Sequence, residues 1–171
     1  MITIFSPKIK GFCQKNYNEI IDNLQFHSIT CTCGQTGQLI KHGYYTRSIK
    51  TPVGLINLKI LRVKCKCCKK THAVLLDFIV PYSRISLKDH LLIIKSYENK
   101  QSYDPIMLSN PYIDEGNIAY VIKQYINHWK QRLLAFGLII NKCIVKNCFS
   151  VFKRQFMQIK RCLNILFLET T

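Results

Sequence analysis

The chain has 171 residues, of which 48% are hydrophobic, and a formal net charge of +16 from 25 lysines and arginines against nine acidic residues. This apolar content is sufficient for a folded core and excludes an intrinsically disordered chain. A charge of this size favours an anionic partner, either nucleic acid or an acidic membrane surface.

The first segment, residues 1–29, is expected to hold two short elements. Ile2 to Phe5 suits an edge strand, and Tyr17 to Phe26 carries apolar residues at helical spacing. The run Ile2 to Phe5 is too short for the apolar core of a secretory signal, and Pro7 follows it closely. We therefore expect a cytoplasmic protein, whose nine cysteines stay reduced and are available to bind metal.

The second segment, residues 30–82, has the pattern of a β-hairpin. Two runs rich in Ile, Leu and Tyr, Leu39 to Ile49 and Leu55 to Lys64, flank the turn Thr51 to Gly54, whose proline and glycine suit a tight reversal. A third strand, Thr71 to Leu76, is expected to pair with the second run. Nine basic residues and one acidic residue give this segment a net charge of +8, half of the charge of the chain.

The third segment, residues 83–136, is predicted to be helical. Ser86, with Asp89 three residues later, is a good N-cap for a helix that ends near Asn99. Asp104 is expected to cap a short second helix that opens with a proline and ends before Asn110.

A longer third helix is expected to begin after Asp114. Apolar residues recur there at steps of three and four, which is typical of a helix with one buried stripe, namely Ile118, Val121, Ile122, Tyr125, Trp129, Leu133 and Phe136. Three helices of this order permit a helix–turn–helix arrangement.

The last segment, residues 137–171, is predicted to be a basic, amphipathic extension. Phe149, Phe152, Phe156 and Ile159 stand at helical spacing among lysines and arginines. No membrane crossing is expected, because the longest apolar stretch, Leu133 to Val145, falls short of about 20 residues. A homodimer or protein contact through this extension is an alternative use for it.

Four cysteines have the spacing of a metal site. They form two close pairs, Cys31 with Cys33 and Cys65 with Cys68, and two tight turns of this kind can supply a tetrahedral set of thiolates to one structural Zn²⁺. Gly34 suits the first turn, because the backbone amides must fold towards the sulfur atoms. Because the pairs lie at the open end of the predicted hairpin, the layout is that of a zinc ribbon.

Other interpretations of these residues remain open. The cysteines could be small buried side chains of a reduced protein. His72 could replace Cys68 as a ligand. In the arrangement with Cys65 and Cys68, Cys67 is a spare thiol.

Several short motifs resemble a bacterial domain of unknown function that is related to the N-terminal zinc-ribbon regions of insertion-sequence transposases. These are Cys31-Thr32-Cys33-Gly34, KHGYYTR at 41–47, LRVKC at 61–65, THA at 71–73 and IVPY at 79–82, within a match over roughly residues 30–130. The resemblance implies a zinc ribbon followed by a helix–turn–helix, with DNA binding as the role. It also supports Cys65 and Cys68 as ligands, because family members commonly carry Cys-x-x-Cys at the second turn.

The expected fold class is therefore α+β: a small zinc-ribbon β-hairpin module, an all-α helix–turn–helix-like region and a C-terminal amphipathic helix. An enzyme is not expected. Transposases use carboxylates that hold two metal ions in a catalytic domain larger than the segment after residue 136. The few acidic residues include Asp114 and Glu115, which are better explained as the cap and first turn of a helix.

Two groups of residues are candidates for contact with nucleic acid, most simply double-stranded DNA. Helix residues could read bases in the major groove: Asn117, Tyr120, Lys123, Gln124 and Asn127. Basic residues of the ribbon could bind phosphates: Arg47, Lys50, Arg62, Lys64, Lys66, Lys69 and Lys70. The alternatives are a solvated helix face, a protein-interaction module, and RNA binding through the hairpin tyrosines.

Overall fold

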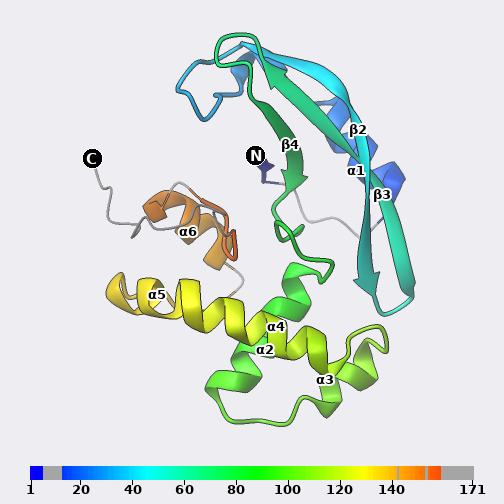
Figure 1. Cartoon of the computed structure of the whole chain (residues 1–171), viewed down its shortest axis with the longest axis vertical. Helices are drawn as coiled ribbons and strands as arrows, with labels where there is room; N and C mark the ends of the chain where they lie inside the picture. Colours follow the sequence, from blue (N-terminus) through cyan, green and yellow to red (C-terminus); the bar gives the residue numbers. More distant parts are fainter. Residues whose placement is uncertain (6–12, 142, 153, 159–171) are drawn as a thin grey trace.

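The computed structural model describes residues 1–5, 13–141, 143–152 and 154–158. It has an α+β fold, in which a long hairpin and two shorter strands are followed by helices (Figure 1). In chain order the elements are β1 (Ile2–Ile4), α1 (Gln14–Asp22), a 3₁₀ turn (Phe26–Ser28), β2 (Leu39–Thr51), β3 (Gly54–Cys65), β4 (Thr71–Leu76), α2 (Leu87–Glu98), α3 (Asp104–Ser109), α4 (Glu115–Tyr125), a π-helical turn (Ile126–Lys130), α5 (Gln131–Ala135) and α6 (Ile144–Phe152).

The four strands form one sheet in the order β1-β4-β3-β2. The predicted hairpin is confirmed, but it is longer than expected, because Thr51 pairs with Gly54 and only Pro52 and Val53 remain in the turn. β4 pairs antiparallel with β3, as predicted, and β1 is an edge strand parallel to β4. Joining β1 to β4 requires contacts between residues about 70 positions apart, which hairpin patterns alone do not reveal.

Helix α1 covers one face of the sheet and begins earlier and ends earlier than the predicted Tyr17 to Phe26. Tyr17 is buried, and its hydroxyl group donates to the carbonyl oxygen of Val74 and accepts from the amide of Leu61, both at 2.9 Å. The β3–β4 register runs from Lys64 and Thr71 to Arg62 and Ala73. The next pair would be Leu61 with Val74, so the hydroxyl group bridges the two strands where they separate.

Two of the predicted helix caps are confirmed. The Ser86 side chain accepts a hydrogen bond from the amide of Asp89 at the start of α2, and Asp114 accepts from the amide of Asn117 at the start of α4. The prediction for α3 is wrong by one position, because Asp104 lies inside the helix and Tyr103 is its N-cap. The proline that follows Asp104 occupies a first-turn position, where its missing amide leaves no partner unsatisfied.

The long helix expected after Asp114 is confirmed, with one irregularity. Helices α4 and α5 are joined by the π-helical turn Ile126–Lys130, which adds a residue to the turn and shifts the buried stripe. Trp129 within this turn is 1% exposed and makes edge-to-face contacts with Phe152 and Phe156. The π turn therefore directs the only tryptophan of the chain into the core beside the C-terminal segment.

The predicted C-terminal helix through Phe149, Phe152 and Phe156 is partly wrong. Helix α6 begins at Ile144 and ends at Phe152, so Phe156 lies beyond it, in a buried turn. The Gln155 side chain in this turn donates to the carbonyl oxygens of Asp77 and Ile79 and is fully buried. These bonds to the chain after β4 stabilise a turn in place of a continuing helix. Ile159 and the basic residues at 160 and 161 lie outside the described residues.

Buried side chains form two clusters. One lies between α1 and the sheet and includes Cys31 and Cys65, and the other joins α2 to α6 with the chain at Val80 and Ile85. The tip of the hairpin reaches the helices (Figure 1), where Lys50 contacts Asp114 and Asn117. Within the described ranges, no helix has the length and apolar content to cross a membrane.

Candidate metal centre and basic surface

Two tight turns carry the cysteine pairs. In the first, the amide of Gly34 donates to the carbonyl of Cys31 at 2.9 Å, and in the second, the amide of Lys69 donates to the carbonyl of Cys65 at 3.0 Å. The residue directly after the second cysteine is left-handed in both turns, with φ of +88° at Gly34 and +60° at Lys69. The two turns therefore have the same backbone conformation, although only the first has a glycine at the left-handed position, where glycine is favoured.

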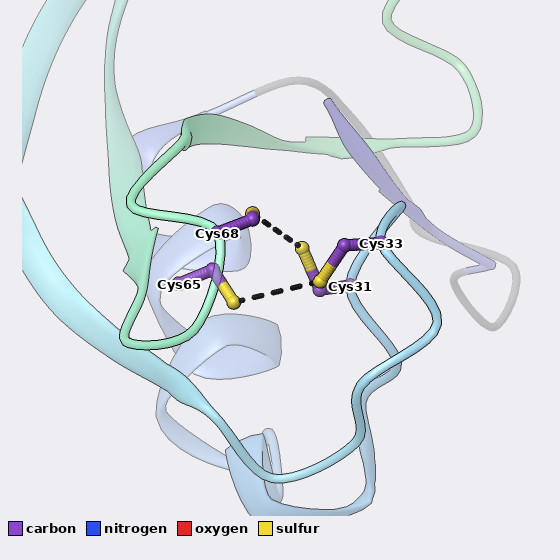
Figure 2. Close-up of side chains that lie close together, drawn as sticks. All are labelled: Cys31, Cys33, Cys65 and Cys68. Carbon is purple, nitrogen blue, oxygen red and sulfur yellow. Dashed lines mark hydrogen bonds between the residues drawn. The ribbon is translucent and has the colours of Figure 1, made fainter.

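The four predicted ligands Cys31, Cys33, Cys65 and Cys68 lie together (Figure 2), with their sulfur atoms all within 4.8 Å of one another. Cys31 Sγ is 3.7 Å from Cys68 Sγ, and Cys33 Sγ is 3.9 Å from Cys65 Sγ. Zn–S bonds of about 2.3 Å in a tetrahedron place neighbouring sulfur atoms about 3.8 Å apart. The cysteine geometry thus fits a tetrahedral ion, and the exposed Cys67 lies outside the cluster.

The cysteine cluster is partly buried, and its thiols differ in exposure and in pKa. Cys31 and Cys65 are buried, whereas Cys33 is exposed. Burial raises the pKa of Cys31 to about 11, and the hydrogen bond from the backbone of Gln35 lowers the pKa of Cys33 to about 7. A thiolate is therefore easier to form at Cys33 than at Cys31, and a bound cation would favour the thiolate form of Cys31.

His72 touches the cluster from one side. Its Nε2 lies 3.3 Å from Cys31 Sγ, and its Nδ1 lies 2.8 Å from the amino group of Met1. Because an ammonium group can only donate, Nδ1 accepts and Nε2 carries a proton directed at the Cys31 sulfur. Desolvation by burial, followed by the Met1 ammonium group, lowers the pKa of His72 and favours this neutral form. In this arrangement the imidazole is a hydrogen-bond donor to Cys31, and the group that could hold a metal ion comprises the four cysteines.

Most of the predicted phosphate contacts surround the second cysteine turn. Arg62, Lys66, Lys69 and Lys70 are exposed, and Lys64 is half-buried. Five cations within nine residues, with no acidic residue among them, give this end of the sheet a strongly positive surface. We call the side chains of these five residues the basic turn.

Three of the predicted nucleic-acid contacts, Arg47, Lys50 and Asn117, have partners within the fold. The Arg47 guanidinium group donates to the backbone carbonyls of Val80 and Ser83. Lys50 Nζ lies 3.3 Å from the Asp114 carboxylate and donates to the Asn117 side chain. The bond from the amide of Asn117, and then Lys50, lowers the pKa of Asp114. These side chains fasten the hairpin to the chain after β4 and to α4, and the charge of Lys50 is partly neutralised by Asp114.

The remaining helix candidates lie on the outer face of the long helix. Tyr120, Lys123 and Asn127 are exposed, and Gln124 is half-buried. Their spacing of three and four residues places them on one stripe, opposite the buried Ile118, Val121 and Tyr125. The sequence periodicity therefore located this face correctly.

Sequence patterns gave no indication of a buried pair beside Arg47. Ser83 Oγ lies 2.8 Å from His90 Nε2 and also accepts from the amide of Ile85 at 3.1 Å. Burial lowers the pKa of His90 to about 3, so that this histidine stays neutral. Ser83 and His90 come from a loop and a helix with no recognisable local motif, and their contact depends on tertiary packing. The pair holds the loop that Arg47 also contacts.

Comparison with protein families places part of the chain in a described family model. A family model described as Domain of unknown function (DUF6431) matches residues 30–109, a region that begins one residue before Cys31 and ends with α3. No curated protein and no solved structure matched the chain. All four clustered cysteines and the basic turn lie inside the matched region, whereas α4 lies after it.

Proposed function

We propose that Cys31, Cys33, Cys65 and Cys68 bind one zinc ion and that the chain is a zinc-stabilised DNA-binding protein. The observation that carries the metal assignment is the sulfur spacing of 3.7 and 3.9 Å. It agrees with the edge of about 3.8 Å in a tetrahedral zinc–thiolate centre. Four soft sulfur ligands also disfavour Mg²⁺ and Ca²⁺, which take oxygen ligands.

The role of this zinc is structural. Four protein ligands complete a tetrahedral shell and leave no position for a substrate or an activated water. The ion would join the loop that carries Cys31 and Cys33 to the β3–β4 turn. It would also place the basic turn, because Lys64 and Lys66 flank Cys65, and Lys69 follows Cys68.

The proposed binding partner of the basic surface is double-stranded DNA. Support comes from the net charge of +16, from the exposed cations of the basic turn, and from the order α3, turn, α4, which suits a helix–turn–helix. The outer stripe of α4 would contribute Tyr120, Lys123 and Asn127. Arg47, Lys50 and Asn117 have protein partners, so this proposal gives them a supporting role.

We also infer a binding role without catalysis. Asp114 serves as a helix cap beside Lys50, and the group of potential metal ligands among the described residues consists of cysteines. A relation to the N-terminal regions of transposases rests on the motif resemblance of residues 30–130 and is part of the same proposal.

Binding of a fluorescent DNA duplex over a salt series tests the DNA proposal. Each phosphate contact contributes about 0.9 to the slope of log K against log salt concentration. The double variant K66A/K70A should therefore reduce the magnitude of this slope by about 1.8. The matched control K88A/K95A removes two exposed lysines of α2 and should leave the slope within experimental error.

Two outcomes would reject the DNA proposal: no binding of the duplex at low salt, or equal losses in the two double variants. Equal losses would mean that the affinity reflects overall charge and not the basic turn. Zinc content measured on the same samples keeps the two parts of the proposal separate.

A further inference from the structure

A cleft of about 450 Å³ lies on the face of the sheet opposite α1. On β4, Thr71, Ala73 and Leu75 line it, while the alternate residue His72 faces the cysteine cluster on the other side of the sheet. The other lining residues come from the amino end of the chain, β2 and the loop after β4: Met1, Tyr45, Arg47, Tyr82, Ser83 and Arg84. The cleft is therefore separated from the proposed zinc centre by the thickness of the sheet.

The lining has an unusual combination of groups. Two phenol rings, Tyr45 and Tyr82, and two guanidinium groups, Arg47 and Arg84, stand beside apolar side chains, and no acidic residue contributes. A second cleft of about 380 Å³, between α2 and α3, is lined by Leu92, Ser96, Gln101, Ser102, Pro105, Ile106 and Ser109. That cleft has neither an aromatic ring nor a charge. A ligand of the first cleft would therefore be anionic and would present a flat ring.

The rim of the cleft is held in place by several bonds. Arg47 donates to the carbonyls of Val80 and Ser83, and the amide of Lys50 donates to the carbonyl of Arg84 at 2.7 Å. These contacts fasten the 80–84 loop to β2. The loop is thus pre-formed, which lowers the entropic cost of binding.

Tyr82 has an uncommon backbone conformation at this rim. Its φ is +60°, a left-handed value that disfavours a bulky residue, yet its side chain is 65% exposed and fills no core position. A strained backbone with an exposed ring is explained if the ring itself is needed at the cleft. Arg84 is also exposed, so a ring and a cation stand two residues apart in sequence at the opening.

The geometry points to a nucleotide site: the cleft binds an unpaired nucleotide, with the base stacked on the tyrosine rings and the phosphate group paired with Arg84. Base–aromatic stacking and arginine–phosphate pairing are the interactions that proteins use for single-stranded nucleic acid. This site goes beyond the proposed duplex binding, because a paired base is stacked inside the helix and cannot enter. The nucleotide could come from a single strand or be a free mononucleotide.

Calorimetric titration of the full chain tests this site, with adenosine 5′-monophosphate, adenosine and inorganic phosphate as separate probes. The monophosphate should bind saturably, and more tightly than either fragment, because it engages both the rings and the arginine. An unpaired oligo(dA) of eight nucleotides and the same strand in a duplex form the next two arms. Tighter binding of the oligonucleotide than of the monophosphate assigns the site to single strands, and equal affinity assigns it to the free nucleotide.

Variants at Tyr82 provide the decisive comparison. Tyr82→Gly removes the ring and accepts the left-handed φ, so the fold is retained, whereas Tyr82→Phe keeps the ring. Loss of one stacking contact should weaken binding of the monophosphate about 5- to 150-fold in Tyr82→Gly, and Tyr82→Phe should bind normally. Tyr44 is exposed on β2 but does not line the cleft, because it faces away from its cleft-lining neighbour Tyr45. Tyr44→Phe and Tyr44→Ala therefore form the matched pair outside the cleft and should have no effect on this probe.

The inference is overturned if neither the monophosphate nor the oligonucleotide binds saturably at millimolar concentration. It is also overturned if Tyr82→Gly binds them as tightly as the native chain. The duplex arm separates this result from the proposed function. If Tyr82→Gly still binds the duplex, the basic turn is supported as the DNA-binding surface even when the cleft binds no nucleotide.

Discussion

Replacing Tyr17 by phenylalanine should destabilise the fold strongly for the loss of one oxygen atom. The hydroxyl group is buried and serves both the amide of Leu61 and the carbonyl of Val74 at 2.9 Å. The β3–β4 pairing ends at Arg62 and Ala73, so the amide of Leu61 and the carbonyl of Val74 do not hydrogen-bond to each other. Each buried polar group left without a partner costs about 1–3 kcal/mol, so the free energy of unfolding should fall by about 2–4 kcal/mol, allowing for partial relaxation.

Urea denaturation followed by circular dichroism measures this loss, with equal metal content in all samples. Tyr44→Phe is the control, because Tyr44 on β2 is 58% exposed and its change should stay within about 0.5 kcal/mol. A loss below about 0.5 kcal/mol in Tyr17→Phe would refute the reasoning, since it would mean that the strands pair or admit water without the hydroxyl group.

Three further predictions concern other parts of the fold. Ser86→Ala should cost about 1–2 kcal/mol in thermal or chemical unfolding, because it removes a buried helix cap; a loss no greater than that of the exposed Ser102→Ala would contradict this. His90 stays neutral in the folded chain down to about pH 3, whereas an unfolded histidine is protonated below about pH 6.5. As the pH decreases from 6.5 to 3, the unfolded chain therefore binds a proton that the folded chain does not, and the free energy of unfolding should fall by at most about 1.4 kcal/mol per pH unit. His90→Gln should flatten that dependence, and an unchanged slope would show that another group is responsible. Gly34 and Lys69 both have left-handed backbones, which glycine adopts more easily than other residues. Lys69→Gly should therefore raise the free energy of unfolding of the metal-loaded chain by up to about 1 kcal/mol, and Gly34→Ala should lower it by about 1–2 kcal/mol. Changes of the opposite sign in thermal melting would reject the shared turn geometry.

Local sequence patterns predicted the elements whose causes are local. The side chains of Ser86 and Asp114 each bond to an amide three residues later, so a cap can be recognised without tertiary information. The hairpin turn around Pro52 and the two cysteine pairs belong to the same class. The left-handed φ at Lys69 was not foreseeable, because the residue type gives no sign of it.

Features that depend on tertiary packing were not visible in the sequence. Arg47 and Lys50 are basic residues of the kind that contact phosphates, yet in the fold they bind partners 33 to 67 residues away in the sequence, among them Val80 and Asn117. Helical spacing continues through Phe156, but the bonds of Gln155 to the chain after β4 end the helix before it. Periodicity reports which face is apolar, and it does not report where a competing long-range contact interrupts the helix.

The most direct test of the account is the zinc content of the purified chain, measured by mass spectrometry for the native sequence, Cys68→Ser and Cys67→Ser. The two variants change adjacent cysteines of one turn, and only Cys68 belongs to the sulfur cluster. We expect one zinc per chain in the native protein and in Cys67→Ser, and a clear loss in Cys68→Ser. A native chain without zinc, or equal zinc in Cys68→Ser, would contradict this expectation.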